Sequence, residues 1–286
     1  MKRLLRLIGK TLGVLAVLGV VAYGVVYALS DRVMGRTYEV PVAALSIPHD
    51  EASIAEGRRL ATVHGCFSGC HGKQAEGTIY FDKPPIARVV APNLTDSVRR
   101  YSDAELDATI RHGVRPGGRS LLIMPSESFI QLTNEEVGRI IAFLRALPPA
   151  AGPGPSVSLG PLGRIGLATG KFKTAAQLIA ATVPPPKAVD GGTSQGRDLA
   201  WTVCAPCHDT SLRGTSNPDF TSADLHIVSA YSPEAFTQLL RTGVALGGRN
   251  LAAMGEWSRN NLSQLNDAEI AALYGYLHSL SGSARN

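Results

Sequence analysis

The pattern of hydrophobic positions first sets apart one long segment near the N-terminus. Thr11 to Leu29 comprises nineteen residues without a charge, and Leu7 and Ile8 extend it. At about 1.5 Å per residue, a helix of this length crosses a hydrocarbon core of ~30 Å. Residues 1–30 are therefore predicted to form a membrane anchor that spans the bilayer through residues 11–29.

Four basic residues precede the apolar segment: Lys2, Arg3, Arg6 and Lys10. Basic residues beside a span stay in the cytoplasm, so the rest of the chain is expected outside it. The alternative is a cleaved signal peptide, with a weak cleavage site after Ser30. The apolar region of a signal peptide is usually only ~7–15 residues long. The uncleaved anchor is therefore the preferred interpretation.

Beyond the anchor, apolar periodicity and capping signals predict helices at residues 53–64, 103–112, 134–146, 194–203, 233–242 and 267–280. Ser53, Ser102 and Thr133 each precede a glutamate by three residues, which is the pattern of a capping box. Gly113 and Gly243 stand where a left-handed residue ends a helix. The chain has no alternating strand pattern of consequence, so we predict an all-α fold.

The same pattern occurs twice. Residues 101–124 align with residues 231–254 without a gap, and both copies contain Gly-Gly-Arg followed by a methionine. An exact internal period indicates duplication. We expect two tandem domains, at residues 51–149 and 193–286, with residues 31–50 linking the first to the anchor.

Residues 150–192 are expected to connect the two domains. Prolines stand at both ends of this segment, which predicts an extended, semi-rigid connection. Its middle, residues 162–183, is apolar with three charged residues. It is expected to form a helix that packs on a domain or, alternatively, rests on the membrane surface. The packed helix is the simpler interpretation.

The net charge of +5 belongs mainly to the anchor. Without the four N-terminal basic residues, 24 lysines and arginines face 23 aspartates and glutamates. No basic patch remains that would attract nucleic acid, and no charge block indicates disorder. Nucleic-acid partners are therefore not expected.

The four cysteines carry the chemistry. Cys204-Ala205-Pro206-Cys207-His208 is the attachment pattern of a c-type haem, in which two thiols bond the porphyrin edge and the imidazole binds iron. A structural zinc site would need a second Cys/His pair in the same unit. We predict covalent haem attachment at Cys204 and Cys207, with His208 as an axial iron ligand.

The first unit departs from this pattern. Cys66 and Cys70 have three residues between them, and His71 follows. Gly69 is expected to absorb the extra residue, because glycine tolerates unusual φ angles. The alternatives are a disulfide or a copy without haem. The repeat favours a second covalent haem, held by Cys66 and Cys70 with His71 on the iron.

Two of the four methionines occupy equivalent places in the repeat. Met124 lies 53 residues beyond His71, and Met254 lies 46 beyond His208. We predict that they are the second axial ligands, because thioether sulfur gives a haem of relatively high potential. His112 is the rival ligand in the first unit. Arg119 and Arg249 are candidates for contacts with haem propionates, or are solvated loop residues.

These features together resemble the membrane-anchored dihaem cytochromes c of bacteria, with each half similar to a class I cytochrome c. The segments 91–95, 111–116 and 124–127 are also similar to that family's, and the resemblance covers residues 31–280. It implies two class I cytochrome c-like domains carrying two covalently bound haem c groups. It also implies a single-pass protein of the bacterial inner membrane whose haem domains face the periplasm. The implied partners are redox proteins: a dehydrogenase, an oxidase, a soluble cytochrome or another membrane complex.

An electron relay is the expected function, because iron with six ligands offers no open position for a substrate. No catalytic residue is therefore expected. A dihaem peroxidase is the enzyme alternative, and it would need one open haem with acid–base groups beside it. A subunit of a larger dehydrogenase, oxidase or other membrane redox complex is the third possibility.

Overall fold

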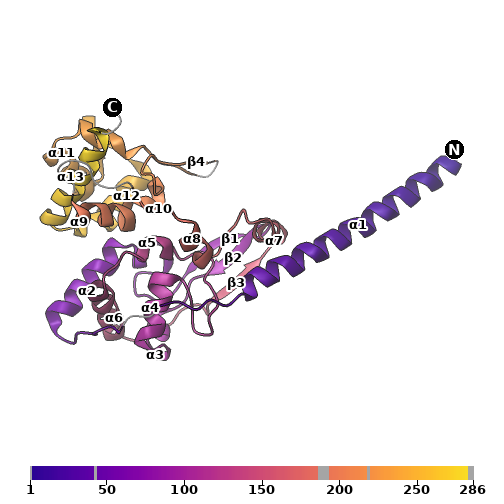
Figure 1. The fold of residues 1–286 in the computed structure, drawn as a ribbon, viewed down its shortest axis with the longest axis horizontal. Helices are drawn as coiled ribbons and strands as arrows, with labels where there is room; N and C mark the ends of the chain where they lie inside the picture. Colours follow the sequence, from indigo (N-terminus) through magenta and orange to yellow (C-terminus); the bar gives the residue numbers. More distant parts are fainter. Residues whose placement is uncertain (1, 42–43, 186–192, 218–219, 283–286) are drawn as a thin grey trace.

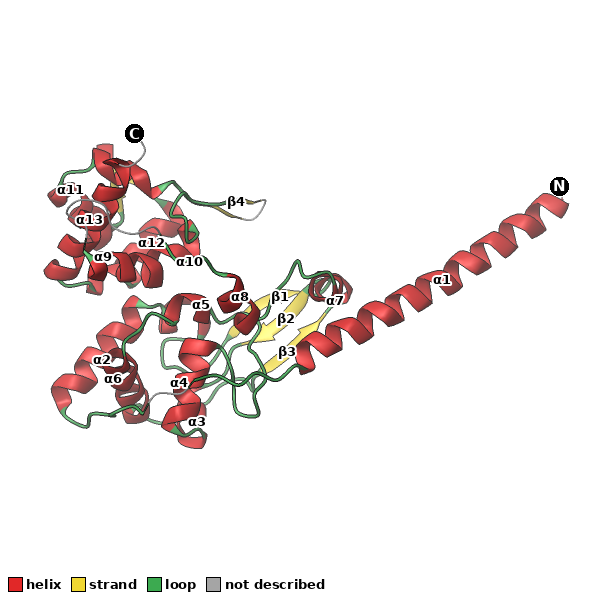
Figure 2. Ribbon diagram, viewed as in Figure 1, coloured by secondary structure: helices red, strands yellow, loops and turns green. Residues whose placement is uncertain are grey.

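A computed structural model describes residues 2–41, 44–185, 193–217 and 220–282. Helix α1 (Lys2–Gly35) projects away from two domains that lie one above the other (Figure 1). Helices predominate in both domains, which confirms the predicted all-α class (Figure 2). Helix α1 is long and apolar enough to cross a membrane, and no part of its most apolar stretch is buried by the rest of the protein.

The first domain is built on the packing of α2 (Glu51–Val63) against α6 (Asn134–Ala146). Between them in sequence come α3 (Leu94–Arg100), α4 (Asp103–His112) and α5 (Ser126–Phe129). The core of this domain contains Leu60, Val137, Ile141 and Phe143. Most of its buried side chains are aliphatic, so packing rather than polar bonding holds the helices together.

The second domain repeats this arrangement. Its α9 (Ser194–Leu199) packs against α13 (Asp267–Gly282), and α10 (Ala205–His208), α11 (Pro233–Thr242) and α12 (Ala252–Asn260) complete it. Its core contains Trp201, Phe236, Leu273, Tyr276 and Leu277.

Equivalent glycines allow the two helix pairs to approach closely. A Cβ added at Gly57 would lie 1.9 Å from the Arg139 carbonyl oxygen, and one at Gly196 would lie 2.1 Å from that of Ala272. Any side chain at either position would separate the helices. The glycine common to both copies of the repeat is therefore a packing requirement.

Most helix boundaries agree with the predictions. The capping boxes at Ser102 and Thr133 are confirmed, and Gly113 and Gly243 end their helices with φ of 61° and 77°. The capping box predicted at Ser53 is wrong, because α2 begins earlier and Asp50 caps it by accepting a hydrogen bond from the Ser53 amide.

The segment expected to be a linker lies largely on the first domain. Its β3 (Ser156–Leu159) extends an antiparallel sheet with β2 (Ala87–Val90) and β1 (Ile79–Lys83), which the sequence did not predict. The predicted apolar helix is two helices, α7 (Pro161–Ala168) and α8 (Ala175–Ala181), with Gly170 at φ 72° between them. Residues 186–192 lie outside the described part of the chain.

The two domains contact each other through side chains from both cores. Val63 of the first domain joins the apolar core of the second. Arg59 donates hydrogen bonds to both carboxylate oxygens of Glu269 at 2.8 Å, and also bonds Glu56 on its own helix. Arg59 and Glu269 side chains are only 20% and 12% exposed, so this pair is shielded from water.

We predict that Arg59→Met loosens the contact between the domains. Removing the guanidinium leaves the Glu269 and Glu56 carboxylates without their main partner, which costs about 1–3 kcal/mol. Calorimetric unfolding of the holoprotein measures this loss. Arg88→Met is the matched control, because its ion pair with Asp82 is about half exposed and is worth at most about 1 kcal/mol. Equal effects of the two substitutions would contradict the prediction.

Candidate haem sites

A backbone carbonyl orients the histidine in each cysteine motif. The Nδ1 atom of His71 lies 2.9 Å from the Pro92 oxygen, and that of His208 lies 2.8 Å from the Ala223 oxygen. A carbonyl only accepts, so Nδ1 carries the proton and Nε2 keeps its lone pair for a metal. Burial lowers the pKa of both imidazoles, which favours the neutral form that binds iron.

The loop after each histidine folds in the same way. Gly77 donates its amide to the His71 carbonyl, and Gly214 does so to that of His208. Further along, the Leu94 amide bonds the Ala75 carbonyl, and the Leu225 amide bonds that of Leu212, both at 2.8 Å. Thr78 and Ser222 hydroxyls each donate to the carbonyl of the second cysteine. The two sites therefore share one architecture despite their different cysteine spacing.

The capping residue of the next helix belongs to this loop as well. Asn93 follows Pro92 and caps α3, accepting from the Thr95 amide. Asp224 follows Ala223 and accepts from the His226 amide. Each cap fixes the carbonyl immediately before it, which is the one that the histidine contacts. The segment 91–95 thus supports His71, a role that its sequence alone did not reveal.

All four cysteines are free thiols, so neither motif forms a disulfide. Cys66 and Met124 both pack against the core of the first domain, and Cys204 and Met254 both pack against that of the second. Burial raises the pKa of the Cys66 and Cys204 thiols to about 12 before they are bonded to a porphyrin.

The extra residue in the first motif is absorbed by a π-turn. Residues Cys66–Cys70 form one turn of π-helix, in which the His71 amide bonds the Cys66 carbonyl at 3.1 Å. A π-turn accommodates one more residue than an α-turn, and such turns occur frequently at functional sites. The role predicted for Gly69 is wrong, because Gly65 rather than Gly69 has a positive φ.

The remaining predicted residues lie in the second half of each unit, where Met254 falls in the first turn of α12. Met124 and Met254 are both partly buried, whereas Arg119 and Arg249 are exposed. Arg249 bonds the Leu246 carbonyl at 3.5 Å, and the backbone of Arg119 pairs with Thr37. Neither arginine is held by an ion pair among the described residues. His112 lies partly buried at the end of α4.

His64 is buried at the C-terminal cap of α2. Its ring lies edge-on to Phe129, and its Nδ1 atom has no protein partner among the described residues. Burial lowers its pKa to about 4, so it is neutral at physiological pH. Its position two residues before Cys66 was the signal that could have drawn attention to it.

The two domains make a pair of matching contacts, each between a residue near one site and a residue near the other. Trp201, three residues before Cys204, donates its indole N–H to the Glu127 carbonyl, three residues after Met124. In the opposite direction, the Trp257 ring, three residues after Met254, packs on Gly65, which precedes Cys66. Each histidine-side segment thus contacts the methionine-side segment of the other domain.

Tyr80 on β1 responds to the second cysteine of each motif. Partial burial raises its pKa, and Cys70 and Cys207 act in the same direction. The residue is still 43% exposed. Sequence reasoning missed this residue because the sheet that carries it was not predicted.

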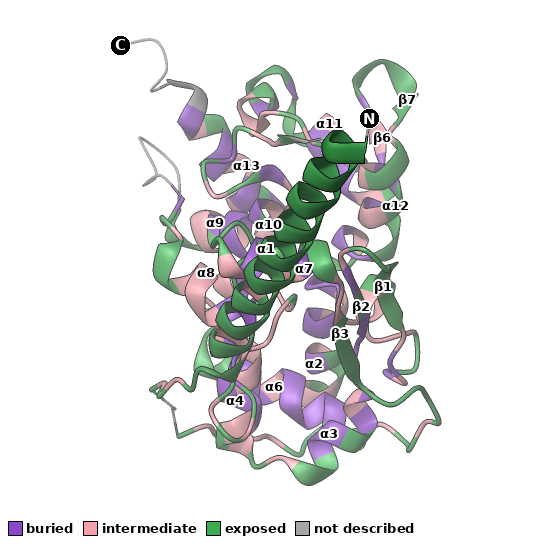
Figure 3. Ribbon diagram, turned by 90° about the vertical axis from the view of Figure 1, so that its right-hand side faces the viewer, coloured by how far each residue is buried: buried purple, intermediate pink, exposed green. Residues whose placement is uncertain are grey.

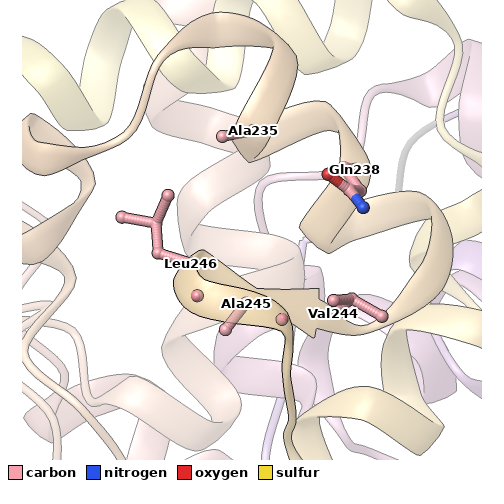
Figure 4. Close-up of a pocket in the computed structure, with 7 residues that line it drawn as sticks. Ala235, Gln238, Val244, Ala245 and Leu246 are labelled. Carbon is pink, nitrogen blue, oxygen red and sulfur yellow. The ribbon is translucent and has the colours of Figure 1, made fainter.

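A shallow pocket elsewhere in the second domain is separate from these sites. Ala235 and Gln238 of α11 and the turn from Val244 to Gly248 line it (Figure 4). It contains neither cysteine, histidine nor methionine. Its lining offers no ionisable side chain for chemistry.

Comparison with known families settles what the repeated unit is. The cytochrome c family model matches residues 54–148 and again residues 193–281, which together make up more than half of the chain. The chain belongs to the cytochrome c family. Two such domains bind two covalently attached haem c groups, and the protein is an electron-transfer cytochrome.

The curated relatives are subunits of dehydrogenases. The chain is 25% identical over 262 residues to the fructose dehydrogenase cytochrome subunit of Gluconobacter japonicus, covering 82% of this chain and 54% of the relative. It is 32% identical over 113 residues to the cytochrome c subunit of the quinone-dependent alcohol dehydrogenase of Gluconacetobacter polyoxogenes, covering 36% and 24% of the two chains. The cytochrome thus spans about half the length of the first of these relatives, and less of the second.

The residues present fit haem c in both domains. Each unit offers two unpaired thiols, an imidazole with its Nε2 free, and a methionine packed against the same core as the first cysteine. Among the described residues, no cluster of histidine, cysteine and carboxylate side chains is arranged to hold a metal ion directly. The donor set is therefore the one that a thioether-bound porphyrin requires.

We predict that Gly69→Ala leaves the first site intact. A Cβ at Gly69 meets no atom within 4 Å, so both haems and the melting temperature are expected to be retained. Gly65→Ala is the contrasting variant. Its φ is 73° and its Cβ would lie 2.3 Å from the Trp257 ring, so we expect a loss of about 2–4 kcal/mol from left-handed strain and overpacking.

Haem content by intact mass and thermal unfolding of the holoprotein distinguish the two variants. Loss of one haem in Gly69→Ala, or no destabilisation in Gly65→Ala, would contradict this account of the π-turn.

Proposed function

We propose that this cytochrome is the electron-transfer subunit of a membrane-bound dehydrogenase and passes single electrons from it to a further redox protein. The relatives that support this are themselves cytochrome subunits of a fructose and an alcohol dehydrogenase. Haem c supplies reversible one-electron chemistry at its iron. The chain's own residues determine where each haem is held.

The reciprocal contact between the domains is the observation that carries the relay. The Trp201–Glu127 and Trp257–Gly65 contacts join the histidine side of each site to the methionine side of the other. Such an interface keeps the two sites at a fixed separation, as a pair of carriers in series requires. Two sites with the same fold, held close together, are what a one-electron relay needs.

In this proposal Cys66 and Cys70 attach the first haem and Cys204 and Cys207 the second. His71 with Met124 would hold the iron of the first haem, and His208 with Met254 that of the second. The two haem domains occupy about residues 51–149 and 193–286. Because each domain supplies both of its own ligands, neither iron is open to peroxide. The peroxidase alternative is therefore disfavoured, and the cytochrome itself is not expected to be an enzyme.

The proposed location is the bacterial inner membrane, with both haem domains in the periplasm. Helix α1 contains the apolar span, and its four basic residues precede that span at the N-terminus. Basic residues beside a span remain on the cytoplasmic side. The domains at the other end of α1 then lie on the opposite side, where the thioether bonds of c-type cytochromes form. Exposed Arg119 and Arg249 remain candidates for propionate contacts.

We predict that Met124→Leu and Met254→Leu each open one iron. Leucine has a similar volume but offers no sulfur, so carbon monoxide is expected to bind one of the two reduced haems in each variant and both in the double variant. Absorbance titration of the reduced protein with carbon monoxide counts the open sites. The wild-type protein is the control, and strong binding to one of its haems would contradict the relay.

We also predict two haems per chain and two resolved one-electron steps. Mass spectrometry of the purified protein counts the haems, and a redox titration followed by absorbance resolves the steps. A single haem would show that the Cys66–Cys70 spacing is not used.

To test for the dehydrogenase, the complex solubilised from native membranes is examined for haem reduction on addition of sugars or alcohols. No reduction by any such substrate would refute the proposed donor.

A further inference from the structure

Three apolar side chains lie exposed on and beside α7. Leu162, Ile165 and Phe172 are 54%, 41% and 43% exposed, and we call these three residues the α7 face. Another side of α7, with Gly163 and Leu167, is buried. Phe172 folds back on this helix, because its amide bonds the Gly166 carbonyl and its ring packs on Gly166. A short helix therefore buries one side and presents an apolar other side.

Helix α7 is fixed to the end of the apolar helix α1. Arg164 donates hydrogen bonds to Ser30 and Asp31, both at 2.8 Å, and its guanidinium lies 3.5 Å from the centre of the Tyr27 ring. The two helices lie side by side at this point (Figures 1 and 3). The position of α7 relative to α1 is thus set by an ion pair and a cation–π contact rather than by a free linker.

This end of α1 is at the level where a membrane meets water. Leu29 is the last apolar residue of the span, and after Ser30 comes Asp31, the first charged residue. Tyr23 and Tyr27 stack edge to face just before that boundary. Tyrosines concentrate at the headgroup level of membranes. Since Arg164 contacts Tyr27 and Asp31, α7 lies at this same level.

Exposed basic residues occur near the α7 face in sequence or on the adjoining helix. Lys171 and Lys173 flank Phe172, Arg32 lies in the last turn of α1, and Arg36 follows that helix. Asp31 is the one carboxylate in this group, and Arg164 neutralises it. Apolar side chains beside exposed cations are typical of segments that lie in the interface of a phospholipid bilayer.

We propose that the α7 face inserts into the surface of the same bilayer that α1 crosses, so that the first haem domain rests on the lipid. The inference depends on the proposed membrane anchor. Its occupant is the phospholipid surface, because the face is continuous with the span and shares its depth. The domain then has two attachments to the membrane, one through α1 and one through α7.

Quenching by lipid tests the proposal in the full-length holoprotein, reconstituted in nanodiscs. A small bimane fluorophore is placed on Ile165→Cys, and nanodiscs with acyl-brominated phospholipid are compared with unbrominated ones. Haem attachment consumes the native thiols, and the wild-type chain taken through the same labelling reports any that remain. We expect bromine to quench the Ile165→Cys label at least twofold.

Two further label sites serve as controls. Val17→Cys, in the apolar stretch of α1, is expected to be quenched if α1 spans the bilayer. Leu246→Cys is exposed beside α11 at the far end from α1 and is expected to show no quenching (Figure 1). Quenching of Val17→Cys alone would leave the α7 face in water, free for a protein partner, and would overturn the inference. Loss of quenching at both positions would overturn the anchor as well.

A second variant separates insertion from mere proximity. Leu162→Ser with Phe172→Ser, carried by the Ile165→Cys protein, removes apolar side chains that are already exposed, so the fold is expected to be kept. Quenching at Ile165→Cys is expected to fall, while quenching at Val17→Cys in the same background stays unchanged. Undiminished quenching at Ile165→Cys would show that the α7 face does not insert, and would refute the proposal.

Discussion

The hydrogen bond between each histidine and a backbone carbonyl is the constraint on which both sites depend. It fixes the tautomer and the plane of the imidazole, so the nitrogen that keeps its lone pair for a metal is determined by the loop that supplies the carbonyl. That loop is in turn held by a helix cap, Asn93 or Asp224, one residue further on. The amide bonds from Gly77 and Gly214 close the loop on the histidine itself. The ligand geometry therefore rests on main-chain bonding, which tolerates sequence change, and this explains why two rather different sequences form the same site.

The sequence predicted the helices well where caps mark them and less well where tertiary packing decides. Ser102, Thr133, Gly113 and Gly243 act locally, and the structure confirms all four. The sheet of β1, β2 and β3 escaped prediction because its strands have only four or five residues, and because β3 pairs with β2 across a long separation in sequence. The apolar segment 162–183 was identified, but its division into two helices depends on Gly170.

In the candidate sites, too, local sequence signals were predictive and features that depend on tertiary packing were not. The cysteines and histidines were recognisable from spacing, and the methionines from the repeat. The residues that support the motifs were not recognisable. Pro92 and Ala223 act through their backbone carbonyls, and Tyr80 through its position, and neither property depends on the type of residue. The prediction for Gly69 was wrong because an added residue can be absorbed by changing the hydrogen-bond step of the helix rather than one φ angle. Contacts between the domains, such as Arg59 with Glu269, involve residues 210 apart and have no sequence signature.

The clamp of Arg164 on the end of α1 has a consequence for how this cytochrome meets its partners. A haem domain on a flexible linker would sample many orientations before it met a redox partner in the right one. A domain fixed to its own anchor, as we propose for this one, presents the same side to every neighbour in the membrane plane. Encounter then becomes a two-dimensional problem of lateral diffusion with a fixed approach angle, and a partner's electron-donating group must lie at a matching height above the lipid. A fixed orientation limits the range of partners that can bind. In return, it keeps the distance over which electrons are transferred constant.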